Sequence, residues 1–364
     1  MKTTRTSSRK EQHVAITLRK DVSFRTKSPG FERWEFLHNA LPEINLSQVS
    51  ASTAFLGKTV GLPLILSSMT GGYAEAAKIN AGLAEACAVR NIAMGVGSQR
   101  QALEDASFHK SYRIAREVAP EIPLFGNIGA AEVARLRDVS PIRKLADLIR
   151  ADGFAVHLNP LQEFLQPEGS PEFSGVLRGI EMMVRHMPIP IIVKEIGAGI
   201  SGAVARRLLD AGVAVIDVAG AGGTSWAGVE IIRRGDGVRG PATGRNGTRH
   251  QVRPSPDDVD VFWDWGIPTV DALLQVASLK ISHPELVLVA SGGISSGMDV
   301  AKSIALGADL AGVARPALKA LERGGVKGLI AWVDRIALQI RGAMFLTGSR
   351  SIDELRRQQL IGRP

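Results

Sequence analysis

From Pro63 onward, short apolar runs alternate with stretches in which apolar positions recur every three to four residues. The short runs have the length of buried parallel strands, and the longer period is that of a helix with one buried face. The expected strands are Leu64–Leu66, Ile92–Val96, Leu124–Asn127, Phe154–Leu158, Ile191–Lys194, Ala214–Val218, Leu286–Ala290 and Leu310–Val313. The expected helices are Ala74–Val89, Ser111–Val118, Pro141–Arg150, Phe173–Arg185, Gly202–Ala211, Val270–Leu279 and Gly297–Leu306.

Eight strands alternating with helices predict an α/β protein, a closed (β/α)8 TIM barrel with an irregular N-terminal arm. A doubly wound open sheet produces the same spacing and is the alternative architecture. We expect residues 1–60 to form an arm packed on the barrel, 61–350 the barrel and 351–364 a C-terminal tail. An Arg/Gly-rich insertion at about 233–256 lengthens the loop after the sixth strand and is a candidate lid.

Composition narrows the class of protein. The single cysteine, Cys87, excludes an intramolecular disulfide. The N-terminus is basic but has no apolar signal segment, and no run reaches the ~18 apolar residues of a membrane span. We therefore expect a soluble, cytoplasmic protein with no membrane partner.

The formal net charge of +8 indicates an anionic partner. The excess of positive charge lies at the N-terminus and in the insertion, without a recognition-helix pattern or interleaved aromatic residues. This distribution favours a phosphorylated small substrate over nucleic acid. A non-enzymatic basic binding protein is the other class of function, but it leaves the polar strand ends unexplained.

Polar residues follow the fourth expected strand at once, where His157, Asn159, Gln162 and Glu163 lie within seven positions. Comparable polar or glycine-rich segments follow other strands: Ser67–Gly72, Gly97–Arg100, Gly126–Gly129, Val193–Glu195, Ala219–Trp226 and Ser291–Gly293. The carboxyl ends of barrel strands meet at one rim, which is where barrel enzymes build their active sites. The sequence thus predicts one active site at this rim.

A phosphate site is expected beside the last two strands. Gly292 and Gly293 follow the seventh strand and Arg315 follows the eighth, where barrels commonly hold a phosphate with backbone N–H groups. A tight βα turn is the alternative explanation of the two glycines. Lys194 ends the fifth strand and is expected to be desolvated. It could form a Schiff base, face an anionic cofactor atom, or pair with a carboxylate on a neighbouring strand.

Glu163 is the candidate metal ligand, because one carboxylate with substrate phosphate oxygens and water is a usual Mg²⁺ site. His157 could bind or protonate a substrate together with Gln162, or could be a structural histidine. Arg100 could clamp a diphosphate. Arg9 and Lys10 taken alone are typical of a solvated basic tail.

Eight motifs in chain order resemble the type 2 isopentenyl diphosphate isomerases, which are FMN-dependent (β/α)8 barrels. The motifs are Arg9-Lys-x-x-His13, Ala40-Leu-Pro-Glu-Ile44, Ser68-Met-Thr-Gly-Gly72, Gly97-Ser-Gln-Arg100, His157-x-Asn-x-x-Gln-Glu163, Lys194-Glu-Ile-Gly-x-Gly-Ile-Ser201, Gly222-Gly-Thr-Ser-Trp226 and Ala314-Arg-Pro316. The resemblance implies reversible 1,3-allylic isomerisation of isopentenyl diphosphate to dimethylallyl diphosphate, with reduced FMN as acid/base and Mg²⁺ on the diphosphate. It also implies NADPH as the reductant of FMN and a homo-oligomer, a tetramer or an octamer.

The resemblance further implies a role for each matching residue. Those expected to hold FMN are Ser68, Met69, Thr70, Ser98, Asn127, Lys194, Thr224, Gly292, Gly293, Ala314 and Arg315. Those expected to bind substrate are Arg9, Lys10, Ser98, Gln99, Arg100, Asn159 and Gln162, with Glu163 on Mg²⁺. His157, Gln162 and Lys194 are the catalytic candidates, Lys194 by stabilising the anionic reduced flavin.

Two related kinds of enzyme fit the sequence less well. FMN-dependent 2-hydroxy acid oxidases need a histidine base at a late strand end, but the sixth strand here ends in Ala219–Trp226, which contains no histidine. Barrels of the inosinate dehydrogenase kind need a loop cysteine, whereas Cys87 lies inside the first expected helix.

Overall fold

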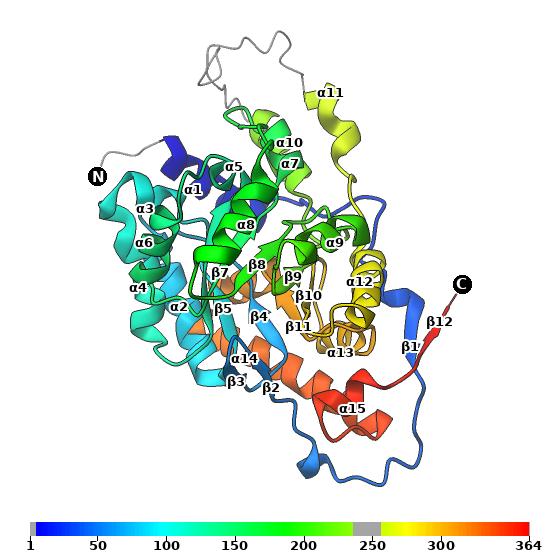
Figure 1. Cartoon of the computed structure of the whole chain (residues 1–364). Coiled ribbons are helices and arrows are strands. Elements are labelled where there is room, and N and C mark those ends of the chain that lie inside the picture. The colour runs from blue at the N-terminus through cyan, green and yellow to red at the C-terminus, as the bar shows by residue number, and fades with distance from the viewer. Residues whose placement is uncertain (1–4, 236–255, 364) are drawn as a thin grey trace.

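The computed structural model describes residues 5–235 and 256–363 and has a closed barrel of parallel strands at its centre (Figure 1). The strands pair in the order β10-β11-β4-β5-β6-β7-β8-β9. Their bounds are β4 Leu64–Leu66, β5 Ala93–Gly95, β6 Leu124–Gly129, β7 Gly153–His157, β8 Ile191–Lys194, β9 Val215–Asp217, β10 Val287–Ser291 and β11 Leu310–Val313. Closure confirms the predicted TIM barrel and excludes the open sheet.

The seven expected helices are present and their ends agree to within three residues. They are α2 Ala76–Arg90, α4 His109–Val118, α6 Ser140–Leu148, α8 Val176–His186, α9 Gly202–Asp210, α12 Thr269–Ala277 and α13 Gly297–Ala305. Shorter helices that the periodicity did not predict are α3 Arg100–Glu104, α5 Ala130–Val133, α7 Pro160–Leu165, α11 Pro256–Val259 and α15 Ile352–Arg356. Three longer ones were also missed, α1 Arg5–Arg19, α10 Trp226–Gly235 and α14 Arg315–Thr347.

Two apolar layers hold the barrel together. The larger fills the space between strands and helices, and the smaller lies inside the barrel. A hairpin of β2 (Thr53–Phe55) and β3 (Lys58–Val60) contributes Phe55 and Val60 to the inner layer. The hairpin therefore plugs one end of the barrel, and the opposite rim is left for the loops that follow the strands.

The N-terminal arm is not irregular throughout, which corrects the expectation from sequence. Arg5–Arg19 form helix α1, which packs against α10 and lies with α7 and α10 at one end of the barrel (Figure 1). The sequence of its first nine residues, Arg5–His13, contains no apolar residue, so it has no clear apolar period there. Tertiary contacts, such as the buried Ile16 against Val22 and Val229, stabilise this helix.

The C-terminal tail pairs with a strand of the N-terminal arm in a small antiparallel sheet. Strand β12 (Leu360–Gly362) of the expected tail pairs with β1 (Trp34–Phe36) of the arm. None of the described helices combines the length and the apolar character needed to cross a membrane. Of the insertion expected at 233–256, residues 236–255 lie outside the described residues, and so does any lid function there.

Candidate active site at the barrel rim

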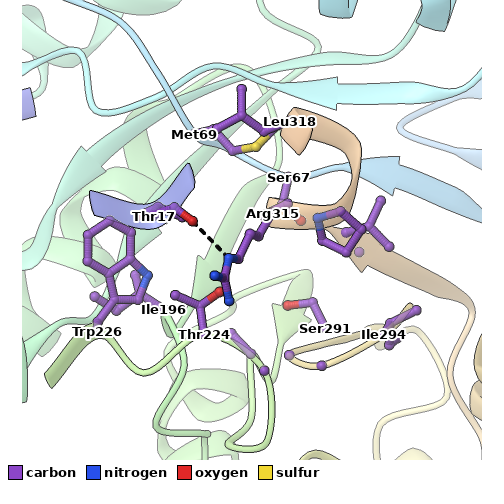
Figure 2. Close-up of a pocket in the computed structure, with 18 of the residues that line it drawn as sticks. Thr17, Ser67, Met69, Ile196, Thr224, Trp226, Ser291, Ile294, Arg315 and Leu318 are labelled. Atoms are coloured by element: carbon purple, nitrogen blue, oxygen red, sulfur yellow. Dashed lines mark hydrogen bonds between the residues drawn. The ribbon is translucent and has the colours of Figure 1, made fainter. Parts of the chain in front are cut away.

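A cavity of about 330 Å³ opens at the carboxyl ends of the strands. Its wall brings together loops from distant parts of the chain: Ser67–Met69 after β4, Gly222–Thr224 after β9, Ser291–Ser295 after β10 and Ala314–Pro316 after β11. Apolar side chains of Met69, Ile196, Trp226, Ile294 and Leu318 share the wall with these polar loops (Figure 2). The volume is in the range of pockets for organic ligands.

The glycines of the expected phosphate corner have backbone shapes that other residues rarely adopt. Gly292 and Gly293 have φ values of +100° and +74°. A Cβ on Gly292 would lie 2.1 Å from the carbonyl oxygen of Gly220, and one on Gly223 would lie 2.4 Å from the backbone nitrogen of Gly293. The two loops therefore pack backbone against backbone, which is more than a tight turn needs and leaves N–H groups beside the cavity.

Unpartnered polar groups face the same cavity. The hydroxyl oxygens of Ser67 and Ser68 are buried and have no hydrogen-bond partner among the described residues. Helix α14 begins at this wall, and its N-cap, Ala314, has no side chain to cap the first N–H groups. Buried donors without partners are costly, so these groups indicate a polar or anionic ligand.

Arg315 lies in the cavity wall, but its guanidinium is directed at the N-terminal arm. Nε donates to the Thr17 carbonyl at 2.9 Å (Figure 2), and outside that view Nη2 donates to the Lys20 carbonyl at 2.9 Å. Both carbonyls lie at the end of α1. Arg315 thus fastens the arm over the cavity, in addition to placing positive charge beside it.

Lys194 reaches the cavity from the end of β8, with 7% of its surface exposed. Its ammonium donates to the carbonyl of Glu195 at 2.6 Å. Within the part of the chain that the structure describes, no carboxylate forms an ion pair with it, although Asp217 is its register partner on β9. Burial raises the pKa of Asp217, against the opposing effects of the Lys194 charge and a hydrogen bond from Ser291. Lys194 is therefore a buried cation facing a ligand cavity.

His157, at the end of β7, is close enough to Lys194 in the cavity wall and to Arg9 and Lys10 on α1 for their charges to affect it. Burial, followed by the charges of Lys194, Lys10 and Arg9, lowers the pKa of His157 to about 3. Its Nδ1 is 2.9 Å from Oδ1 of Asn127. His157 is thus neutral at physiological pH and is suited to hydrogen bonding rather than to holding a proton.

Arg9 and Lys10 are not a solvated tail. Lys10 Nζ donates to the Ser98 carbonyl at 2.7 Å, and Arg9 Nη1 donates to Oε1 of Gln166 at 3.5 Å. Burial, followed by the charges of Arg9 and Arg100, lowers the pKa of Lys10 to about 7. Helix α1 therefore places Lys10 against the loop after β5 and Arg9 against the end of α7.

A buried ion network joins α1 to α7 and α10, and sequence reasoning missed its central residue, Glu230. Glu230 on α10 is fully buried, and its Oε1 lies 2.9 Å from Nε2 of His13. Its Oε2 accepts from Nη1 of Arg233 at 3.0 Å, and Oε1 accepts from Nε2 of Gln162 at 3.0 Å. Arg233 also pairs with Glu168. Glu230 lies outside every motif and in a helix that the periodicity did not predict, so nothing in the sequence marked it as part of the site.

Despite the burial, His13 and Arg233 lower the pKa of Glu230 to about 2. The charged carboxylate is therefore the stable form, and it orients the amide of Gln162.

Glu163 stands beside Asn159 at the start of α7. Its carboxylate accepts from Asn159 Nδ2 at 3.0 Å and from the Ser170 backbone N–H at 2.7 Å. Asn159 Oδ1 is buried without a partner among the described residues. No cluster of three or more His, Cys, Asp or Glu side chains able to hold a metal is present in the described ranges. A cation at Glu163 would therefore need ligands from substrate and water.

Other predicted residues lie outside the cavity wall. Gln99 is fully buried; it donates to the Leu145 carbonyl at 2.9 Å and accepts from the Asn127 N–H at 3.1 Å, so its amide is already occupied by backbone. Thr70 is buried beside Tyr73, and Asn127 is bonded to His157. Arg100 lies 3.1 Å from Glu104 and 3.0 Å from Glu132.

The residues that were predicted to hold the cofactor and that do line the cavity are Ser68, Met69, Lys194, Thr224, Gly292, Gly293, Ala314 and Arg315.

Comparison with known proteins places this site in a family. The FMN-dependent dehydrogenase family matches residues 3–115 and 157–362. A protein of Pelodictyon phaeoclathratiforme named isopentenyl-diphosphate delta-isomerase is 48% identical, over 99% of this chain and 98% of that protein. One of Chlorobium luteolum with the same name is 46% identical, over 99% and 97%.

Solved structures agree on the fold. A mandelate oxidase variant with benzaldehyde matches with a TM-score of 0.62 at 17% identity, covering 98% of each chain. The barrel, its rim cavity and the sequence identity of 46–48% over 99% of the chain lead to one conclusion. The chain belongs to the FMN-dependent dehydrogenase family and, within it, to the isopentenyl-diphosphate delta-isomerases.

Proposed function

We propose that the protein interconverts isopentenyl and dimethylallyl diphosphate, with FMN in the rim cavity and Mg²⁺ on the diphosphate. The observation that carries this proposal is the juxtaposition of two sites on one rim. One is a cavity with uncapped N–H groups and a buried lysine. The other is a cationic wall, on which α1 and α3 supply cations and the loop after β7 supplies neutral polar groups and Glu163. The charges of Lys194, in the cavity wall, and of Lys10, in the cationic wall, both lower the pKa of His157, which supports the proximity of the two sites.

The cavity residues fit FMN. The phosphate would be held by the backbone N–H groups of Gly292–Gly293 and of Ala314–Arg315, where α14 begins. Thr224, Ser68 and Met69 line the same cavity, and Lys194 would face an electron-rich edge of the flavin. In its reduced form, FMN would supply the acid/base group that protonates the alkene and accepts a proton from the neighbouring carbon.

The cationic wall would bind the diphosphate. Arg9 and Lys10 supply donors, and Nε of Arg9 is buried with no partner among the described residues. Arg100 adds positive charge while it remains paired with Glu104 and Glu132. Neutral His157 and Gln162 would orient the substrate by hydrogen bonds, and α1 would exclude water from the alkene. In the reaction one proton adds to the terminal alkene carbon, the double bond shifts and one proton leaves C2.

The Mg²⁺ ion is assigned to Glu163. One oxygen of this carboxylate already accepts from Asn159 and the other from the Ser170 N–H, which fixes the group but leaves lone pairs free. Diphosphate oxygens and water would complete the shell, as is usual for Mg²⁺. NADPH as the reductant and a cytoplasmic homo-oligomer, tetrameric or octameric, belong to the same proposal.

An anaerobic assay tests the proposal directly. The purified protein, loaded with FMN, is expected to be yellow and to bleach with dithionite or NADPH. In the bleached state with Mg²⁺ it should convert isopentenyl diphosphate, whereas it should not oxidise lactate or mandelate. A protein that cannot be reconstituted with FMN, or that oxidises a 2-hydroxy acid instead, contradicts the proposal.

Glu163→Gln is expected to raise the Mg²⁺ concentration for half-maximal activity by at least about tenfold, because it removes the one carboxylate assigned to the ion. FMN affinity, measured by fluorescence quenching, should stay within about twofold, since Glu163 is not part of the cavity wall. Equal losses of Mg²⁺ and FMN affinity would show that the residue is misassigned.

A further inference from the structure

The ammonium of Lys10 is held by two oxygen atoms at a defined place. Nζ donates to the Ser98 carbonyl at 2.7 Å and to the Tyr112 hydroxyl oxygen at 3.0 Å. The Tyr112 hydroxyl in turn donates to the same Ser98 carbonyl at 2.7 Å. A lysine ammonium has three donors, so two are engaged here and one is left for an anion.

The position of the Tyr112 hydroxyl is fixed by close packing. Tyr112, on α4, is fully buried, and its ring lies against the loop of Gly71 and Gly72. A Cβ on Gly71 would lie 2.1 Å from a ring carbon, and one on Gly72 would lie 2.7 Å from the hydroxyl and 2.9 Å from Lys10 Nζ. The bare glycine backbone therefore makes room for the hydroxyl and the ammonium together. A phenylalanine would fill the same ring space, so the packing alone does not need the hydroxyl.

We propose that Tyr112 is a positioning residue for diphosphate binding, its hydroxyl and the Ser98 carbonyl together aiming the third N–H of Lys10 at the anion. This inference rests on the proposed function, because it takes Lys10 as a ligand of the diphosphate. Tyr112 itself acts through Lys10 and does not touch the substrate.

The charges around Lys10 make the effect of the Tyr112 hydroxyl on the protonation of Lys10 measurable. The groups that face the Lys10 ammonium are Arg9 on α1, Arg100 and Glu104 on α3, Tyr112 on α4 and His157 on β7. Burial and the two arginines bring the pKa of Lys10 to about 7, so part of the population is uncharged near neutral pH. The hydroxyl oxygen accepts a hydrogen bond from the charged form and stabilises it. Burial also raises the pKa of Tyr112, so its hydroxyl keeps its proton and remains a donor to Ser98.

The test is Tyr112→Phe in the FMN-loaded protein, with inorganic pyrophosphate as the probe from pH 6 to pH 9. Loss of a hydrogen bond to a charged group is expected to weaken pyrophosphate binding by about tenfold near pH 7.5. The pH at which binding declines should move lower, because the uncharged form of Lys10 becomes more favourable. Pyrophosphate ionises identically with both proteins, so the shift belongs to the enzyme. FMN affinity and kcat at saturating substrate should stay within about twofold.

The chain offers a matched control, since Tyr73 is its other tyrosine. Tyr73 is also buried, and its hydroxyl lies 3.4 Å from Oγ1 of Thr70 rather than near Lys10. Tyr73→Phe should leave pyrophosphate binding and its pH profile unchanged.

A double variant separates the possible outcomes. Lys10→Met should weaken pyrophosphate binding at least as much as Tyr112→Phe, and adding Tyr112→Phe to it should cause no further loss. Wild-type affinity and pH profile in Tyr112→Phe, or an additional loss in the Lys10→Met background, would overturn the inference alone. If the wild-type protein neither binds pyrophosphate nor converts isopentenyl diphosphate, the proposed function fails, and the inference fails with it.

Discussion

Replacing Lys194 with methionine is expected to lower the conversion of isopentenyl diphosphate by at least about 100-fold, the usual effect of removing one preorganised electrostatic group. Lys194 is a buried cation in the cavity wall with no ion-pair partner among the described carboxylates. Methionine keeps the length and the apolar contacts of the side chain but removes the charge. The loss of activity would therefore come from the lost interaction between the lysine charge and the ligand in the cavity.

A redox titration measures this effect without turnover. A charge-assisted hydrogen bond contributes about 1.5–3 kcal/mol, and 30 mV corresponds to about 1.4 kcal/mol for a two-electron couple. If Lys194 stabilises the more negative, reduced form of FMN, Lys194→Met should make the reduction potential more negative by about 30–60 mV.

The control variant is Lys58→Met, which breaks an ion pair with Asp152 at the hairpin end of the barrel. Because this pair is remote from the cavity, the variant should leave the potential of bound FMN unchanged. A Lys194→Met protein with the wild-type potential would show that the lysine does not face the flavin.

Glu230→Gln is expected to lower the free energy of unfolding by about 3 kcal/mol at neutral pH. Glu230 is fully buried between His13, Arg233 and Gln162, and glutamine would remove one of the two carboxylates that pair with Arg233, leaving Glu168. The lowered pKa of Glu230 leads to a similar value for its contribution to the free energy of unfolding. A carboxyl that titrates near 4.5 when unfolded and at about 2 when folded contributes about 3 kcal/mol once it is ionised in both states.

The sign of this linkage fixes the pH window. The folded pKa lies below the unfolded one, so the contribution of Glu230 is complete above about pH 4.5 and disappears as the pH falls toward 2. The difference in stability between wild type and Glu230→Gln should therefore be largest at neutral pH and should narrow in acid. Chemical denaturation at several pH values measures it.

Glu117→Gln is the matched control for this prediction. Glu117 pairs with Arg113 at the exposed surface of α4, where an ion pair of this spacing contributes about 0.3–0.5 kcal/mol. If Glu230→Gln were no more destabilising than Glu117→Gln, the buried network would not be holding α1 to α10.

Much of the barrel could be predicted because its information is local. The strand Ile191–Lys194 has the same bounds in sequence and structure, and seven helices ended within three residues of their predicted ends. Glycine at positions 292 and 293 permits the positive φ found there, because it has no Cβ. Helix α14 was missed although it is the longest element, and a glycine, Gly325, with non-helical φ and ψ interrupts it.

The sequence by itself determined the alternation of strands and helices, the polar strand ends and the glycine turns, because each depends on residues within a few positions of one another. Only the tertiary structure decided that α1 folds over the rim, that Gln99 is occupied by backbone, and that Lys10 meets Tyr112. The same holds for Glu230, which gains its partners from α1, α7 and its own helix. The physical reason is that burial and pairing, which set the position and charge of these groups, arise from contacts between distant segments and have no local pattern.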